Sequence, residues 1–485
     1  MYIKISTPWR IVLAFFIVLS VAYFWMNDWH LKPRLFVTYA GSDSANISRM
    51  DTSKVSKHYS KYCAGCHGRQ MEKFVKHDWK FGKTKAAIFK AIKYGYTTTG
   101  MPAFDKTFSD KETYELTSYL LSGIEKYKQK PPVVGTSTGQ YSTDLLKIRI
   151  DTVAKIAEVP WSIAFLPGNE LLVTERSGKL YRVNAGALQQ VQGLPALLAA
   201  GQGGLMEVVL HPLFQTNQII YLSYSKPGAD GTSTTAILKA RLQGNQLTDQ
   251  QDIFVAKPYS NTRHHYGGKM LFGRDGYLYF SVGERGNEKQ NPQSLANDLG
   301  KIHRIKDDGG IPADNPFVGN NSVSPSIYSY GHRNPQGIAV NPATGAVWST
   351  EHGPMGGDEI NIIQKGKNYG WPVITYGINY NGTSITDKTA APGMEQPVHF
   401  WVPSIATSGL AFVQGNVYNG WQGDALIGSL KFNWLSRCKL AGNVVSAEET
   451  MLKEVGRLRD VRVSPDGYIY LAVESPGYIL RLMPG

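Results

Sequence analysis

The sequence predicts a mainly β protein, a six-bladed β-propeller preceded by a small all-α domain and an N-terminal transmembrane helix. The 485-residue chain is too long for one ordinary hydrophobic core, which indicates several domains. Its 50 glycines and 27 tyrosines, with short apolar runs between turn residues, favour β-structure over most of the length. A strand–turn–strand unit also recurs six times in the second part of the chain.

The recurring unit consists of an apolar strand, a turn rich in Pro, Asp and Gly, an aromatic-rich strand and a polar loop. Its clearest copies are PWSIAFLPGNELLVTERSGKLYRV, KMLFGRDGYLYFSVGERG, GIAVNPATGAVWSTEHG and DVRVSPDGYIYLAVESPGYILRL, and two weaker copies are VVLHPLFQTNQIIYLSYS and GLAFVQGNVYNGWQGDALIGSL. Units about 45 to 70 residues apart are typical of a propeller with one four-stranded sheet per blade. A two-sheet sandwich is the alternative, but it does not explain the recurring turn. The predicted propeller spans residues 148–485.

Residues 1–30 predict a membrane anchor. Lys4 and Arg10 precede the uncharged run IVLAFFIVLSVAYFWM, and Trp9 and Trp29 flank it as interfacial aromatics. A cleaved export signal is the alternative, but bulky residues follow the run where a small-residue cleavage site is expected. With a retained anchor, we expect the rest of the chain on the periplasmic face of the cytoplasmic membrane of a bacterium.

The stretch KYCAGCHG carries the most specific short motif. Cys63, Cys66 and His67 form the C-x-x-C-H pattern of covalent haem c attachment. On a helical turn these positions share one face, so both sulfurs reach the porphyrin while His67 ligates the iron. A zinc site needs a second ligand pair, and a thioredoxin-like redox pair leaves His67 unexplained. The remaining cysteine, Cys438, is expected to be a buried thiol without a further role.

We expect the haem domain to span residues 51–128. One helix near residues 53–62 delivers the cysteines, and another over residues 109–127 begins with the capping box SDKE. Apolar positions near one face of the second helix are predicted to pack inward; they are Tyr114, Leu116, Tyr119, Leu120 and Ile124.

Met101 lies between these helices in the loop sequence TTTGMPAF and is the predicted sixth iron ligand. His58, His77 and Met71 are its rivals. In layout the domain resembles class I cytochrome c, with His67 and Met101 matching its axial pair.

Positive charge is concentrated in this domain. The net charge is +13, and residues 54–130 hold 16 Lys and Arg against 7 Asp and Glu. Nucleic acid is not an expected partner, because no basic helix or stacking platform accompanies the charge. An acidic redox protein or an anionic lipid surface fits it, and so does a solvated lysine-rich face. Residues 129–147, rich in Pro, Gly, Ser and Thr, predict a linker.

Cationic and histidine-rich loops recur between the predicted blades. They are NTRHHYGGKM, SYGHRNPQG and EHGPMGGDEINIIQKGKNYGWP, followed by SLK and RLRD. Loops at one end of a propeller converge on its central channel, so cations from separate blades can surround one polyanionic ligand. Each loop taken singly is weak evidence, and the fold alone implies no function.

From about Pro160 to its end, the chain resembles the pyrroloquinoline quinone (PQQ) dependent soluble sugar dehydrogenases, in particular their shorter aldose sugar dehydrogenase branch. The shared motifs occur in the family's order: GQGGLMEVVLHPLF, RHHYGGKM, GHRNPQG, EHGPMGGDE, NYGWP, SLK and RLRD with SPDG. The resemblance implies a PQQ site formed by Gln202, Arg333, Asn334, Lys431, Arg457 and Arg459, with His264 beside the ring. It also implies one calcium ion on the carbonyls of Gly353 and Pro354, and a second at positions matching Glu359 and Tyr369.

By the same resemblance His265 is the general base, which takes the proton of the sugar's anomeric hydroxyl as hydride leaves C1. Calcium and Arg333 are expected to stabilise negative charge on the quinone oxygen. The glucose-specific branch carries an acid where this chain has His264, so we do not expect the same sugar preference. The short loops indicate an open cleft and broad substrate acceptance.

The sequence therefore predicts a membrane-tethered enzyme that oxidises aldoses to lactones with PQQ and Ca2+. Its haem c is expected to pass the electrons singly to an external acceptor, either in the respiratory chain or an acidic redox protein. One alternative keeps the cofactors and oxidises another alcohol or a cell-wall sugar. Another is a propeller that binds a glycan or protein without catalysis, although a binding platform does not need a set such as Lys431, Arg457, Arg459 and His265.

Overall fold

The structure is a computed structural model that describes residues 52–67, 71, 74, 79, 82–96, 101–129, 140–286, 288–474 and 476–485. The predicted anchor at residues 1–30 lies outside the described residues, and so do His77, the side chain of Cys66 and residues 130–139 of the predicted linker. Within the described ranges, no helix has the length and apolar character needed to cross a membrane.

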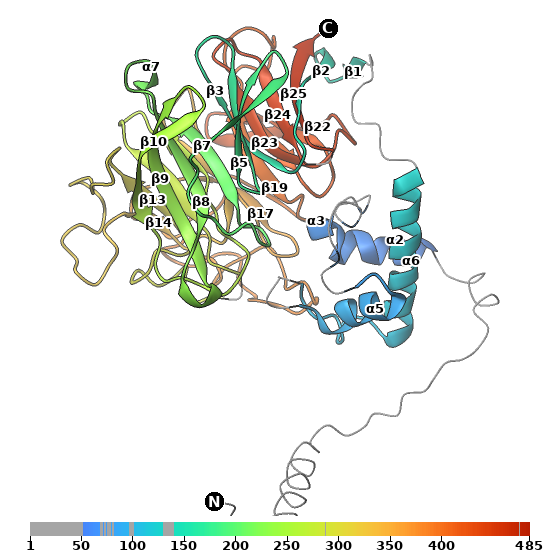
Figure 1. Ribbon diagram of the computed structural model, residues 1–485. Coiled ribbons are helices and arrows are strands. Elements are labelled where there is room, and N and C mark those ends of the chain that lie inside the picture. Colours follow the sequence, from blue (N-terminus) through green and yellow to red (C-terminus); the bar gives the residue numbers. More distant parts are fainter. Residues whose placement is uncertain are drawn as a thin grey trace, which may run out of the picture. The chain divides into compact units, whose positions relative to one another are not determined.

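The described part of residues 140–485 forms six antiparallel sheets, which are the six blades of a β-propeller (Figure 1). Five blades contain four strands that follow chain order. The first strands of neighbouring blades contact one another, which places them nearest the propeller axis. The predicted six-bladed propeller is therefore confirmed, and the sandwich alternative is excluded.

The strands of these five blades have the following bounds. Blade one contains β3 (Pro160–Phe165), β4 (Leu171–Glu175), β5 (Lys179–Asn184) and β6 (Ala187–Val191). Blade two contains β7 (Leu205–Leu210), β8 (Ile219–Pro227), β9 (Ser233–Gln243) and β10 (Gln246–Val255), with the short helices α7 (Phe214–Asn217) and η3 (Ala229–Gly231). Blade three contains β11 (Met270–Phe272), β12 (Leu278–Val282), β13 (Lys301–Ile305) and β14 (Ile327–Tyr330). Blade four contains β15 (Pro335–Val340), β16 (Val347–Glu351), β17 (Asp358–Ile362) and β18 (His399–Trp401), and blade five contains β19 (Thr407–Phe412), β20 (Ala425–Ser429), β21 (Leu435–Ala441) and β22 (Val444–Met451).

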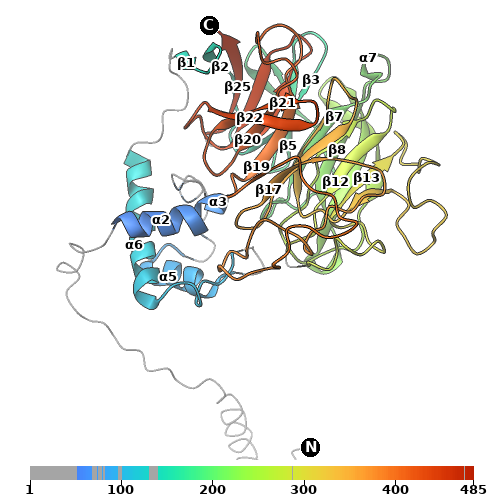
Figure 2. The same cartoon turned by 180° about the vertical axis from the view of Figure 1, so that it is seen from behind.

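The sixth blade joins both ends of the propeller segment. Its inner strands are β23 (Leu458–Val463), β24 (Ile469–Val473) and β25 (Tyr478–Pro484), and β2 (Lys147–Lys155) pairs antiparallel with β25 (Figure 2). The short strand β1 (Gln140–Ser142) then pairs with the start of β2. Hydrogen bonds between the first and last long strands close the ring.

Strand β1 corrects the predicted linker, because Gln140–Ser142 lies inside residues 129–147 and pairs with Lys147–Arg149. The sequence QYS is short and polar and shows no strand pattern of its own. Its strand conformation comes from the pairing partner rather than from local propensity.

Each pair of neighbouring blades encloses its own cluster of buried apolar side chains. Residues such as Leu172 and Leu222, between blades one and two, have no exposed surface. Cys438 lies in the cluster between blades four and five, and burial raises the pKa of its thiol. It is therefore a buried thiol, as predicted.

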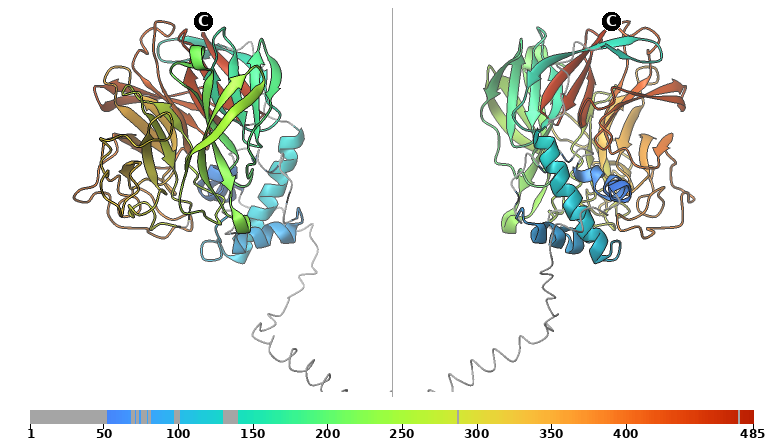
Figure 3. Two further views of the ribbon diagram at one scale, coloured as in Figure 1. Left: turned by 60° about the vertical axis from the view of Figure 1, so that its left-hand side comes forward. Right: turned by 90° about the vertical axis from the view of Figure 1, so that its right-hand side faces the viewer.

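The helical domain contains α2 (Thr52–Tyr62), α3 (Ala64–His67), α5 (Lys85–Tyr94) and α6 (Asp110–Gln129). Helix α6 packs against both α2 and α5 (Figure 3). The predicted capping box is present at its start, because the Ser109 N–H donates to Glu112 Oε2 (3.1 Å) and the Glu112 N–H donates to Ser109 Oγ (3.3 Å).

Two features of this domain differ from the prediction. Tyr114 is 45% exposed and stacks under Lys85, so the inward face of α6 instead includes Thr113 and Thr117 beside the predicted leucines. Helix α5 was not predicted, although Thr84 caps it by accepting a hydrogen bond from the Ala87 N–H (3.2 Å).

Candidate active site

The haem-attachment motif begins at Cys63, directly after α2, and continues through the short helix α3. The Cys63 N–H donates to the Tyr59 carbonyl (2.9 Å), and the His67 N–H donates to the Cys63 carbonyl (3.0 Å). Cys63 and His67 therefore lie one turn apart, as haem attachment requires. The imidazole of His67 stacks on Phe74, with ring centroids 4.4 Å apart.

Met101 is held at the base of its loop, because Tyr96 and Met101 exchange two backbone hydrogen bonds (2.8 and 3.2 Å). Two of its rivals, His58 and Met71, have packing roles. His58 lies against Phe108, with ring centroids 5.2 Å apart, and Met71 is 4% exposed. Met71 packs so closely on α6 that a Cβ at Gly123 would lie 2.2 Å from its sulfur. Ligation of one iron by His67 and Met101 stays a prediction.

In the propeller, His265 is paired with a buried carboxylate. Its Nδ1 lies 2.5 Å from Glu284 Oε2, and its backbone N–H donates to Gln202 Oε1 (2.8 Å). Burial, with the nearby Arg333 guanidinium, lowers the pKa of His265 well below its usual value, so the imidazole is neutral at pH 7. When Nδ1–H donates to Glu284, Nε2 is left as the basic nitrogen.

Burial raises the pKa of Glu284 to about 7. Only the ionised carboxylate stabilises positive charge on the imidazole, so we expect kcat/KM for a reaction in which His265 accepts a proton to fall about tenfold per pH unit below about pH 7 and to level off above it. The matched variant Glu284→Gln keeps an acceptor oxygen but cannot titrate. Its pH–rate profile should lack this acid limb, and an unchanged limb in the variant would assign the titration to another group.

Gln202 and His264 flank this pair. Arg176 Nη1 donates to the carbonyls of Gly201 (2.8 Å) and Gly203 (3.3 Å), which fixes the backbone on both sides of Gln202. His264 is 9% exposed, and its ring centroid lies 6.1 Å from that of His265 in an edge-to-face arrangement.

Arg333 and Asn334 follow strand β14 and are held by blade four. The Arg333 N–H donates to Glu351 Oε2 (2.9 Å), and Arg333 Nη1 donates to the His352 carbonyl (3.1 Å). Asn334 Oδ1 accepts from the Gly267 N–H (3.1 Å). Among the described residues, Arg333 Nε is buried without a hydrogen-bond partner.

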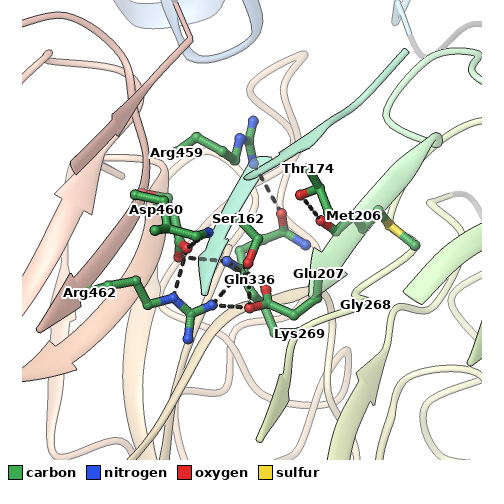
Figure 4. A network of polar contacts seen from close by, with 12 residues as sticks. Ser162, Thr174, Met206, Glu207, Gly268, Lys269, Gln336, Arg459, Asp460 and Arg462 are labelled. Carbon is green, nitrogen blue, oxygen red and sulfur yellow. Dashed lines mark hydrogen bonds and ion pairs between the residues drawn. The ribbon is translucent and has the colours of Figure 1, made fainter. Parts of the chain in front are cut away.

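Arg457 and Arg459 share one carboxylate. Arg457 Nε donates to Glu474 Oε2 (2.8 Å) and Arg459 Nε donates to Glu474 Oε1 (2.8 Å). The Arg459 guanidinium lies over the Trp161 ring (4.2 Å to its centroid), and its Nη1 donates to Gln336 Oε1 (3.1 Å; Figure 4). Arg457 Nη1 donates to the Leu430 carbonyl, directly before Lys431 (2.7 Å).

The structure thus brings cations from blades four, five and six close together. Burial and the charges of Arg333 and Arg459 lower the pKa of His352 well below its usual value, which places both guanidinium groups within electrostatic range of one imidazole. Arg333, Lys431, Arg457 and Arg459 are each at most 7% exposed. Buried cations are costly without anions, and Glu474 is the carboxylate that pairs with both Arg457 and Arg459.

Three acids that hold Arg333, Arg457, Arg459 and His265 were not predicted from the sequence: Glu284, Glu351 and Glu474. They occupy one position of the blade repeat, at or just after the end of the second strand, and Glu175 occupies the same position in blade one, where it pairs with Lys179. All four are at most 4% exposed. The recurrence of Glu in VTER, VGER, STEH and AVES is the signal that could have identified them.

The segment predicted to hold calcium is a tight turn after β16. A Cβ at Gly353 would lie 2.2 Å from the Gly357 carbonyl oxygen and 2.3 Å from that of Gly356, so only glycine fits there. Asp358 Oδ1 accepts from the Gly353 N–H (2.9 Å), and the Pro354 carbonyl accepts from Ser404 Oγ (3.2 Å). A turn lined by carbonyl oxygens suits Ca2+.

Glu359 and Tyr369 are predicted to bind a second calcium ion, and a chain of contacts through Glu351 and His332 connects them. Glu359 lies opposite Glu351 in the sheet, and burial together with the Glu351 charge raises its pKa to about 8. His332 contacts Glu351 (3.3 Å) and stacks on Tyr369. The Tyr369 hydroxyl donates to the Ile362 carbonyl (2.5 Å), so the side chain of Tyr369 is hydrogen-bonded to the backbone. Within the described ranges, no three His, Cys, Asp or Glu side chains form a group that could hold a metal ion.

The fold and site define a propeller protein with a buried cluster of cations and a His–Glu pair. The sequence profile of the family "Glucose / Sorbosone dehydrogenase" matches residues 157–481, and the chain belongs to this family of PQQ-dependent oxidoreductases. The profile "Cytochrome C oxidase, cbb3-type, subunit III" matches residues 51–120, which identifies a cytochrome c-type domain ahead of the propeller.

Three relatives support this assignment. Aldose sugar dehydrogenase YliI of Escherichia coli K12 is 42% identical over 346 residues, covering 70% of this chain and 93% of the relative. The crystal structure of the soluble aldose sugar dehydrogenase from Escherichia coli in the apo form is 41% identical with a TM-score of 0.67, covering 70% of this chain and 100% of that one. The PQQ-bound aldose sugar dehydrogenase from Streptomyces coelicolor is 28% identical with a TM-score of 0.60, covering 70% of this chain and 99% of that one.

Proposed function

We propose that the protein is a membrane-tethered quinohaemoprotein that oxidises aldoses at C1 to lactones with PQQ and Ca2+ and delivers the electrons through haem c to an external acceptor. The observation that carries this proposal is the His265–Glu284 pair beside the buried cations Arg333 and Arg459. The similarity to aldose sugar dehydrogenases over the whole propeller supports the substrate class.

The buried residues fit PQQ, which carries carboxylates and quinone oxygens. Lys431, Arg457 and Arg459 supply the positive charge for its carboxylates, and Glu474 holds both guanidinium groups in fixed orientation. Arg333 has a donor, Nε, that is buried and unsatisfied by the described residues. When bound, PQQ supplies the quinone that accepts two electrons and hydrogen from the sugar.

His265 moves the proton. Nε2 of its neutral imidazole takes the proton of the sugar's C1 hydroxyl, and Glu284 stabilises the resulting charge through Nδ1 (2.5 Å). The sugar loses this proton and a hydride from C1, which leaves a C1 carbonyl and therefore a lactone. The carbonyls of Gly353 and Pro354 would hold Ca2+, which supplies Lewis-acid stabilisation of negative charge.

The cytochrome domain provides a one-electron outlet. Cys63 and Cys66 would attach haem c, His67 would ligate its iron, and Met101 as the other protein ligand would raise its potential. The anchor at residues 1–30 would keep this outlet at the periplasmic face of the membrane, where the respiratory chain or an acidic redox protein accepts the electrons.

A reconstitution experiment tests the dehydrogenase activity. Protein loaded with PQQ and Ca2+ should reduce an artificial dye on addition of aldoses, and a calcium chelator should abolish the activity reversibly. A panel that includes other alcohols and cell-wall sugars separates the substrate classes. If PQQ is demonstrably bound and no aldose reduces the dye, the sugar assignment is wrong.

A further inference from the structure

Four charged side chains on or directly beside the innermost strands of the propeller form a network, and we call them the ionic quartet: Glu207, Lys269, Asp460 and Arg462 (Figure 4). Lys269 Nζ lies 2.9 Å from Glu207 Oε2 and 2.8 Å from Asp460 Oδ1. Arg462 Nε lies 2.8 Å from Asp460 Oδ2, and its Nη2 pairs with Glu207. The side chains of Glu207, Lys269 and Asp460 are at most 2% exposed. Two cations balance two anions, so the network is electrically neutral.

Members of the ionic quartet belong to the motifs of the candidate site. Glu207 follows Gln202 in GQGGLMEVV, Lys269 follows His265 in RHHYGGKM, and Asp460 directly follows Arg459 in RLRD. These three residues belong neither to the proposed PQQ site nor to the His265–Glu284 pair. The quartet instead joins three chain segments, from blades two, three and six, that carry predicted site residues.

The chain between Lys269 and His265 has little freedom. Gly267 and Gly268 have φ values of +65° and +88°, and a Cβ at Gly268 would lie 2.8 Å from the Met206 sulfur. The Gly268 carbonyl accepts from Ser223 Oγ (2.5 Å), and the same hydroxyl oxygen accepts from the Glu207 N–H (2.9 Å). A shift of Lys269 therefore moves the backbone that carries His265.

A second connection links the same segment to the arginine strand. Gln336 Oε1 accepts from Arg459 Nη1 (3.1 Å), and Gln336 Nε2 donates to the Gly267 carbonyl (3.1 Å). Together with the Lys269–Asp460 contact, this bridge ties β23 to the His265 segment at two points. The relative position of His265 and Arg459 is thus set by polar contacts between buried side chains.

We propose that the ionic quartet is a positioning element of the PQQ site, which holds the His265 segment and the Arg457–Arg459 strand at the spacing that PQQ requires. This inference rests on the proposed function. Moving or removing any member of a network of buried, mutually neutralised charges leaves another charge uncompensated. The arrangement in which all charges are paired is therefore strongly favoured. Preorganisation of this kind lowers the cost of binding a rigid, planar ligand.

The test measures PQQ affinity in the full chain before any sugar is added. In Lys269→Met, two carboxylates face one guanidinium, and the Kd for PQQ should rise about tenfold or more. The Kd is measured by titration of the apo protein at a temperature well below its unfolding midpoint, which is measured in parallel. This readout does not depend on turnover.

Arg437→Met is the matched control. Arg437 is a fully buried cation of blade five that lies 2.6 Å from Asp424 and 2.5 Å from Glu449, and it belongs to none of the site motifs. Its replacement should lower the unfolding midpoint but leave the Kd for PQQ within about twofold. The control therefore separates general destabilisation from loss of positioning.

If Lys269→Met does not fold, the neutral double variant Lys269→Met with Glu207→Gln decides the question. It retains the Arg462–Asp460 pair (2.8 Å) but removes the link between blades three and six. Weakened PQQ binding in this variant supports the positioning role. A Kd equal to that of the wild type in either folded variant overturns it, whereas failure of the wild type to bind PQQ overturns the proposed function itself.

Discussion

Replacement of His265 with asparagine or alanine is expected to lower kcat for aldose oxidation by a factor of about 10²–10⁴ and to leave PQQ affinity nearly unchanged. The reason is that neither side chain can accept the C1 hydroxyl proton, whereas the cations that hold PQQ lie in other blades. Asparagine is the better variant, because the backbone of His265 has φ +48° and asparagine tolerates this conformation well. Steady-state kinetics at saturating PQQ and a PQQ titration measure the two effects separately.

His264→Ala is the matched control for this variant. His264 is the neighbouring residue and has the same imidazole side chain. It has no proposed role in proton transfer and is predicted to lie beside the PQQ ring. Its replacement should weaken PQQ binding more than it lowers kcat at saturating PQQ. Full activity of His265→Asn would remove His265 as the base.

Simultaneous replacement of Cys63 and Cys66 by alanine is expected to abolish covalent haem attachment and to lower electron delivery to a protein acceptor by about two orders of magnitude or more. Sugar oxidation with an artificial dye should remain within about twofold of the wild type, because the dye takes electrons from the propeller directly. Haem staining of the denatured protein and parallel assays with the two acceptors provide the measurement.

Cys438→Ala is the matched control, because it removes a cysteine that is not part of the haem-attachment motif. Its thiol is buried between blades four and five, so the variant should keep its covalent haem and its electron delivery to the protein acceptor. If the variant without Cys63 and Cys66 reduces the protein acceptor at the wild-type rate, the haem is not the outlet.

The sequence predicted the propeller because its blades repeat a local pattern, and local patterns need no knowledge of distant contacts. The closing strand β2 depends on pairing between residues more than three hundred positions apart, such as Ile150 and Leu482, and the short β1 forms only by pairing with β2. Pairing of this kind leaves little local signal. Helix α5 is different, because its local signals were present in the sequence and were overlooked. These signals are the cap at Thr84 and the inward-facing Ile88 and Ile92.

The candidate site divides in a similar way. The cations and histidines were identified because they lie in family motifs, and the structure brings Arg333, Arg457 and Arg459 together as buried side chains. The acids Glu284 and Glu474 were missed, since each supports a residue from a different part of the chain. Their roles became visible only in the fold, although their shared position in the blade repeat was present in the sequence.

Sugar oxidation in the propeller is expected to reduce the haem of the same chain. Rapid anaerobic mixing of the PQQ- and Ca2+-loaded protein with excess aldose, followed through the haem absorption bands, tests this expectation directly. We expect complete haem reduction at a rate that does not change with protein concentration. Haem that stays oxidised while the same preparation passes electrons from the sugar to a dye would contradict it.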